Sequence, residues 1–133
     1  MSGDGVAQSV PNWDPKQVLA NAITNNWYYA EEPAFPYGVP SPTEGATQIF
    51  HFSQIVWKTT TTVGCAVSYC DTRILSGNYG WFVVCNYGPA GTSHSPSSKS
   101  HANTLLGNYL GEFATDVTEP IGDAPVQVAT PWA

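Results

Sequence analysis

The chain has 133 residues, of which 42% are apolar and only 11% are charged, a composition typical of one folded domain rather than a disordered tail. Its 10 acidic and 4 basic side chains give a formal net charge of -6, and a surface of that sign repels phosphate backbones, which excludes nucleic acid as a partner. No apolar run approaches the roughly 18 residues that a membrane-spanning helix needs, so no transmembrane segment is expected.

The first element that the sequence predicts is an amphipathic helix over residues 15–31. Asp14 is a suitable N-cap, Pro15 suits the first helical position, and apolar residues then recur at helical spacing. Prolines and glycines forbid regular structure over residues 33–47, which we expect to form a surface loop with Phe35 and Tyr37 as its apolar anchors.

Three apolar segments follow this loop. Residues 49–57 are apolar enough to be buried, but their periodicity fits a short helix and a strand about equally. Residues 63–69 and 81–87 are rich in β-branched and aromatic side chains and predict two strands. Turn-forming residues at 76–78 indicate that the two strands form a hairpin.

The chain has 3 cysteines, so at most one internal disulfide can form. A hairpin centred near Leu75 sets Cys65 opposite Cys85, within reach of a disulfide that closes a loop of about 20 residues. Cys70 is then the unpaired thiol.

The last third of the sequence is poor in apolar residues. Residues 92–107 form a polar run that we interpret as a flexible insertion. Residues 108–117 recover some order, and the proline-punctuated tail at about 119–133 packs as an extended strap or not at all.

Few side chains stand out as candidates for chemistry, because the familiar hydrolase, nucleotide-binding and zinc-protease motifs are absent. His51 lies among aromatic and aliphatic residues, so it is either a core histidine with one backbone partner or a ligand. Glu31 and Glu32 end the predicted helix, where carboxylates are disfavoured by the helix dipole. They are therefore either a solvated tip or functionally placed.

Two long motifs favour a functional interpretation of some of these candidates. Residues 51–60 read HFSQIVWKTT, and residues 82–91 read FVVCNYGPAG. In that order, with VGCA at residues 63–66 between them, they resemble the two signatures of the CAP superfamily of cysteine-rich secretory, antigen 5 and plant pathogenesis-related class 1 proteins. The run EEPAFPY at residues 31–37 is similar to the glutamate that ends a helix in this family, followed by two spaced aromatics.

This resemblance implies an α+β fold, an αβα sandwich with a small antiparallel sheet. Family members line a cleft with two histidines and two acids, which in some members holds a divalent cation such as zinc. His51 matches the second histidine and Glu31 the second acid, whereas Glu32 matches neither. Asp4, in the run GDGVA, is the candidate for the first acid as a shortened substitute for glutamate. No cofactor is expected for the chain itself, and its metal ligands are left unassigned.

The resemblance also implies that residues 1–133 are one partial, fungal-type CAP domain, N-terminally incomplete, with the first helix and its histidine missing. In the family the second signature runs directly into an asparagine, which here appears only at Asn108. Residues 92–107 are therefore either a loop insertion or a retained intron. The family pattern pairs Cys70 with a cysteine of the missing segment, so the thiol is expected to be unpaired here.

The function expected from this resemblance is that of an extracellular, non-enzymatic binding protein for a small apolar ligand such as a sterol or another small lipid. Phe35 and Tyr37 would contact the ligand, and replacing both should abolish binding and spare the fold. One alternative is a metal-assisted, endopeptidase-like hydrolase that uses the Glu31 and His51 cleft. Another is a signalling protein of the cell wall or host interface.

Overall fold

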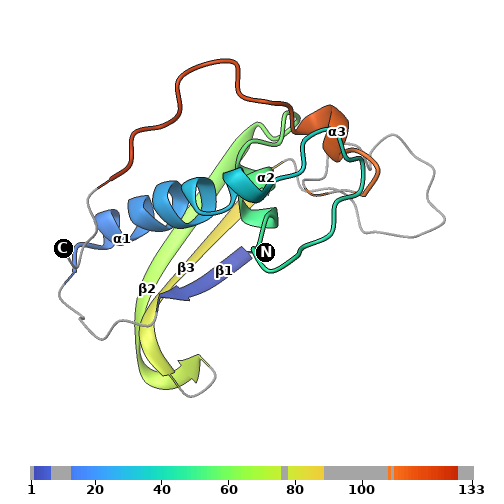
Figure 1. Ribbon diagram of the computed structural model, residues 1–133. Helices are drawn as coiled ribbons and strands as arrows, with labels where there is room; N and C mark the ends of the chain where they lie inside the picture. The colour runs from blue at the N-terminus through green and yellow to red at the C-terminus, as the bar shows by residue number, and fades with distance from the viewer. Residues whose placement is uncertain (1, 7–12, 76–77, 89–107, 109, 129–133) are drawn as a thin grey trace.

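The computed structural model describes residues 2–6, 13–75, 78–88, 108 and 110–128, and at residues 2–6, 71–75 and 78–79 the description covers the backbone alone. In chain order the elements are β1 (Ser2–Val6), α1 (Pro15–Asn21), η1 (Ala22–Tyr29), η2 (Glu32–Ala34), α2 (Phe50–Ile55), β2 (Thr62–Leu75), β3 (Asn78–Gly88) and α3 (Phe113–Asp116). Figure 1 shows the helical segments lying against one small sheet, which confirms the predicted α+β class.

The first helix begins where the sequence predicts, because the Asp14 side chain accepts a hydrogen bond from the backbone N–H of Lys16 at 2.9 Å. The second half of this helix differs from the prediction: from Ala22 to Tyr29 it is a π-helix, in which hydrogen bonds span five residues. This wider turn places Ala22 and Trp27, five residues apart, in the same core, and both are buried.

The sheet is antiparallel, with the strand order β1-β3-β2. The β2–β3 hairpin has the predicted register, with Cys65 opposite Cys85, although two of its predicted turn residues, at 76–77, lie outside the described residues. Strand β1 was not predicted, because glycine and aspartate disfavour strands. Pairing with the central strand β3 overrides that preference.

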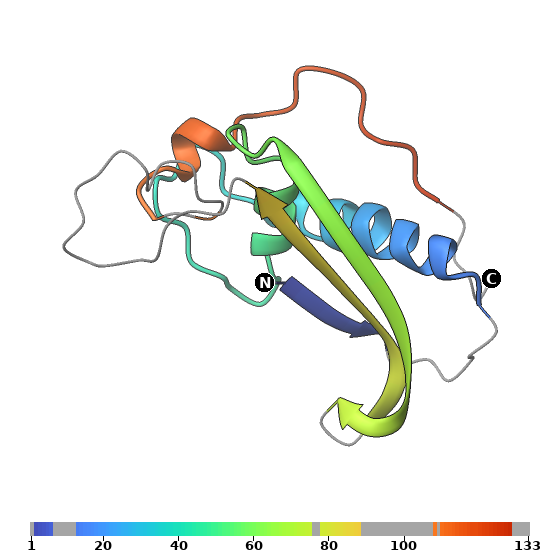
Figure 2. The same ribbon diagram turned by 180° about the vertical axis from the view of Figure 1, so that it is seen from behind.

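The helices α1, η1 and α2 cover one face of the sheet. Figure 2, seen from behind, shows that no described helix covers the opposite face. On that opposite face, Gly64, Ala66 and Ser68 of β2 are exposed. The described part of the chain therefore forms two layers, helix on sheet.

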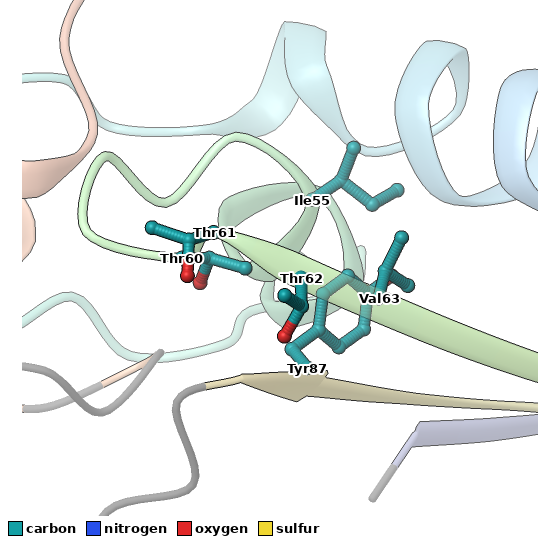
Figure 3. A pocket seen from close by; sticks show the side chains of 6 residues that line it. All are labelled: Ile55, Thr60, Thr61, Thr62, Val63 and Tyr87. Atoms are coloured by element: carbon teal, nitrogen blue, oxygen red, sulfur yellow. The ribbon is translucent and has the colours of Figure 1, made fainter.

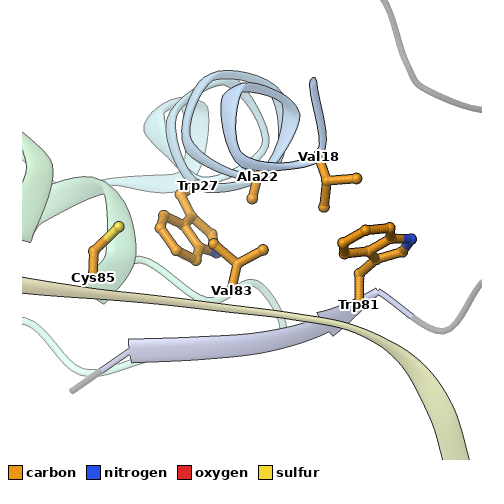
Figure 4. Close-up of a cluster of buried hydrophobic side chains, with 6 residues drawn as sticks. All are labelled: Val18, Ala22, Trp27, Trp81, Val83 and Cys85. Atoms are coloured by element: carbon orange, nitrogen blue, oxygen red, sulfur yellow. The ribbon is translucent and has the colours of Figure 1, made fainter. Parts of the chain in front are cut away.

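Two hydrophobic clusters make the core. The first lies between the helix and β3, where Figure 4 shows side chains from both sides meeting, and it consists of Val18, Ala22, Trp27, Trp81, Val83 and Cys85. The second lies between the loop after η2, α2 and α3, and it consists of Phe35, Ile49, Phe52, Trp57, Phe113 and Val117. Both clusters border the Glu31 and His51 pair, the first through Trp27 and the second through Phe52.

The predicted insertion at residues 92–107 lies outside the described residues, as does the end of the tail, residues 129–133. Residues 118–128 form an extended segment that arches over the helical layer in Figures 1 and 2. Among the described residues, no helix has both the length and the apolar character needed to cross a membrane.

Candidate functional site

The candidate site is centred on Glu31, at the end of the first helical run. Its side chain is buried, and both of its carboxylate oxygens are engaged. Oε1 lies 2.6 Å from Nδ1 of His51, and Oε2 accepts a hydrogen bond from the backbone N–H of Phe52 at 2.9 Å. The structure therefore brings together the two residues that the family resemblance selected.

The hydrogen bond from Phe52 explains why residues 50–55 form a helix. The sequence left this segment open between helix and strand, and its own N-cap residue, Ile49, provides no side-chain cap. The first N–H groups of a helix need acceptors, and a negative charge at this end is favoured by the helix dipole. Glu31 supplies both from a position 21 residues earlier in the chain.

The imidazole of His51 is held on a second side by Trp27. Their rings are stacked, with centroids 5.3 Å apart and an interplanar angle of 10°. The His51 side chain is only 11% exposed. Trp27 reaches this position from the π-helical turn, a geometry that a regular helical periodicity did not reveal.

Glu32 has a different role from Glu31. It is half-buried, and its Oε1 accepts a hydrogen bond from the Tyr37 hydroxyl at 3.0 Å. Burial, together with this hydrogen bond, raises the pKa of the Tyr37 phenol well above its usual range. Tyr37 is thus fixed to the short η2 segment that begins the loop.

Phe35 is a core residue. Its side chain is 5% exposed and packs against Tyr37, Phe52 and Phe113, at centroid distances of 5.1, 5.4 and 6.4 Å. The expectation that Phe35 and Tyr37 can be replaced together without harm to the fold is therefore wrong, because removing a buried ring leaves a cavity. Both residues do anchor the loop, as predicted.

Asp4 lies in β1, where its register partner across the sheet is Val83 of β3. Its side chain lies outside the described part of the structure. Among the residues that are described, no group of three or more His, Cys, Asp and Glu side chains could hold a metal ion. The described ligand candidates are therefore Glu31 and His51.

Asn108 is a site residue whose position depends on the fold. It adopts a left-handed backbone conformation with φ of 56°, which asparagine tolerates better than most residues. Its Nδ2 donates to the carbonyl oxygen of Phe50 at 2.7 Å, and the Ser53 hydroxyl donates to its Oδ1. The asparagine that the second signature lacks at position 92 is thus bound directly to α2.

A separate pocket of about 200 Å³ lies where α2 ends and β2 begins (Figure 3). It is lined by Ile55, Thr60, Thr61, Thr62, Val63 and Tyr87. Burial raises the pKa of the Tyr87 phenol, and no charged side chain lines the pocket. These threonines were not predicted as site residues, because a polar run at the start of a strand carries no specific signal.

The disulfide predicted between Cys65 and Cys85 is present, with a Cα–Cα distance of 4.1 Å between the paired strands. Cys70 is a free, half-buried thiol on β2. The disulfide links the two strands of the hairpin at the first hydrophobic cluster. Cys85 belongs to this cluster, and Cys65 packs against it.

The structure is thus an α+β domain with a buried glutamate–histidine pair and a disulfide-linked hairpin. The chain belongs to the CAP family, the cysteine-rich secretory protein family, whose sequence model matches residues 2–87. The matched range includes Asp4, Glu31, His51 and all three cysteines.

Among curated proteins, the chain is similar to the secreted protein RBT4 of Candida albicans (strain SC5314 / ATCC MYA-2876), with 37% identity over 67 residues. The aligned residues are 50% of this chain and 18% of RBT4, so the chain spans only a small part of the length of that relative. No solved structure matches the chain significantly.

Proposed function

We propose that the chain acts as a non-enzymatic binding module of an extracellular CAP protein and takes a small apolar ligand, such as a sterol or another small lipid. The observation that carries the proposal is the cluster of aromatic rings next to the exposed loop of residues 38–48, a loop that begins directly after Tyr37. The family assignment and the likeness to a secreted relative support the extracellular location.

The aromatic cluster contains seven rings. It joins rings from four segments by contacts of 5.1 to 6.4 Å between centroids, and its members are Tyr28, Phe35, Tyr37, Phe50, Phe52, Trp57 and Phe113. Aromatic surface of this kind provides much of the binding energy in sites for apolar ligands.

The loop of residues 38–48 is lightly attached. Within residues 38–48 only Pro42 is buried, and the main attachment is the carbonyl oxygen of Pro40, which accepts hydrogen bonds from Gly111 at 2.9 Å and Phe113 at 3.3 Å. Displacing the loop would break few contacts, and its attachment to Phe113 lies next to the half-buried ring of Phe50, 5.7 Å from the Phe113 ring. This arrangement supports entry of an apolar ligand between the loop and the cluster.

The geometry of the acid and the histidine favours this function over hydrolysis. Both oxygens of Glu31 are engaged, and Nδ1 of His51 faces Glu31 at 2.6 Å. A divalent cation in a catalytic site needs about three protein ligands and an open position. This donor set does not fit such an ion, and we derive no catalytic step from it.

The test is a titration of the intact protein with a fluorescent sterol and a fluorescent fatty acid. Tyr37→Ala should lower the affinity by at least about tenfold, because loss of a ring contact costs roughly 1.5 kcal/mol. Tyr87→Ala, which changes the pocket of Figure 3, is the matched control and should leave the affinity unchanged.

Three outcomes contradict the proposal. Loss of binding in Tyr87→Ala alone would assign the ligand to the threonine pocket instead. Absence of binding by the wild type would show that the chain does not bind an apolar ligand. A chelator-sensitive peptidase activity that disappears in His51→Ala would establish the hydrolase.

A further inference from the structure

The tail segment of residues 118–128 is attached to the helix through an unusual set of contacts. Nδ2 of Asn25 donates to the carbonyl oxygen of Val128 at 2.8 Å, and Oδ1 of Asn25 accepts from the N–H of the same residue at 3.2 Å. One turn along η1, the hydroxyl of Tyr29 donates to the carbonyl oxygen of Pro125. The helix surface therefore binds this segment at two points.

All three hydrogen bonds use backbone atoms of the tail. The carboxamide of Asn25 pairs with the N–H and C=O of a single residue, as a neighbouring β-strand would. Tyr29 contacts a proline, which has a carbonyl but no N–H to offer. Asn25 and Tyr29 thus recognise the shape of an extended peptide, and this recognition does not require the peptide to belong to the same chain.

The connection between α3 and these contacts is weakly held. Residues 118–127 are all exposed, so releasing them from their present path removes none of their own side chains from a core. Two large apolar residues on this segment, Ile121 and Val126, are 104% and 85% exposed. Isolated exposed residues are ordinary, but here both lie on a segment that could cross between two molecules.

We propose that Asn25 and Tyr29 form a docking site for an extended peptide, and that a second copy of this chain fills the site with its own residues 125–128. Reciprocal exchange of the tails restores every hydrogen bond that each copy gives up, and two-fold symmetry closes the dimer. A foreign peptide would instead displace the tethered tail, and the tail would then have no equivalent site to bind. The two connecting segments of the dimer would lie side by side and bring Ile121 and Val126 into contact with the partner copy.

The tether sets the concentration at which exchange occurs. A tail attached by a short linker has an effective concentration of the order of 1 mM at its own site, so dimers should appear as the chain approaches about 1 mM. Glu119 and Asp123 lie on both connecting segments, and their like charges repel. Exchange should therefore increase as added salt screens these charges.

The experiment is a mixed-label measurement by nuclear magnetic resonance. An unlabelled donor chain carries a spin label at Asp123→Cys on a Cys70→Ser background, and the acceptor is the isotope-labelled full chain. Exchange predicts loss of signal intensity at the backbone amides of Asn25 and Tyr29 in the acceptor. The loss should be larger when the acceptor carries Val128→Pro, which removes the N–H that its own tail donates to Asn25.

Two matched variants make the result specific. Asn25→Ala in the acceptor should abolish the intensity loss while leaving the remaining spectrum, and hence the fold, intact. Val128→Pro in the donor should also abolish the intensity loss, because the donor tail then has no N–H at residue 128 to donate to Asn25 of the acceptor. Either no intensity loss in the Val128→Pro acceptor at about 1 mM, or a loss that Asn25→Ala does not change, would overturn the proposal. Intensity loss confined to the sheet would assign the contact to another surface and would also overturn it.

Discussion

The carboxylate of Glu31 accepts the backbone N–H of Phe52, so the residue that ends the first helical run also caps the start of α2. The same carboxylate contacts the imidazole of His51, the residue that precedes Phe52. The pair therefore joins two helices, and its first consequence is structural.

Replacing Glu31 with alanine should lower the free energy of unfolding by about 2–3 kcal/mol. The change leaves the buried N–H of Phe52 without its acceptor, which costs about 1–3 kcal/mol, and it also removes the contact with the imidazole of His51. Urea unfolding followed by tryptophan fluorescence measures the loss. Glu32→Ala is the matched control, because its half-buried carboxylate has one side-chain partner, Tyr37, and it should cost less than half as much. Equal losses in the two variants would contradict the capping role.

The disulfide between Cys65 and Cys85 should contribute about 3 kcal/mol, the value expected from the loop-entropy account for a closed loop of this length. The double variant Cys65→Ala and Cys85→Ala should show that loss in the same unfolding assay. Mass spectrometry of an unreduced digest should recover the two cysteines as one linked peptide pair, and Cys70 should react with a thiol reagent. Recovery of a linked peptide that contains Cys70 would refute the pairing.

Asp116 should make the protein less stable as the pH rises. Burial raises the pKa of Asp116 above its ordinary value of 3.8, nearby Glu112 raises it further, and Lys58 and Thr59 oppose the rise. The folded state then binds the proton more tightly than the unfolded state. The contribution of Asp116 is therefore most favourable below pH 3.8 and is lost as the pH rises through the raised pKa.

The variant Asp116→Asn removes this titration. Its free energy of unfolding relative to wild type should increase between pH 3 and pH 7, a window of about 4 units around the aspartate pKa. Urea unfolding of both proteins at each pH gives the difference, in which the other carboxylates cancel. A difference that is constant across the window, or that falls with rising pH, would show that the charge of Lys58 and the hydrogen bonds of Thr59 balance or outweigh the effect of burial.

Asn21 should be replaceable by leucine with a gain in stability. The side chain is 1% exposed, and neither of its amide atoms has a hydrogen-bond partner in the described part of the structure. A buried amide without partners costs roughly 1–3 kcal/mol, and leucine has the same branched shape with the same number of side-chain heavy atoms. Thermal unfolding should therefore shift to a higher midpoint in Asn21→Leu. Asn25→Leu, in which two hydrogen bonds to Val128 are lost, is a control that should not gain.

Local chemistry was enough to predict several features of this chain. The cap formed by Asp14, the start of the helix at Pro15 and the register that sets Cys65 opposite Cys85 depend on residues close in sequence or joined by one turn. The motifs around His51 and Cys85 were enough to identify the family because they are long and ordered. Such features follow from short-range geometry, which a single sequence contains.

Tertiary contacts decided the rest. Residues 50–55 become a helix because Glu31 and Asn108, distant in the chain, satisfy its polar groups. The π-helical turn places Trp27 against both the sheet and His51, and a regular period of 3.6 residues does not anticipate it. Phe35 is buried because three separate segments close around it, although its own segment is a proline-rich loop. Burial and hydrogen bonding of this kind depend on which distant residues meet, and that information lies in the folded structure rather than in any local pattern.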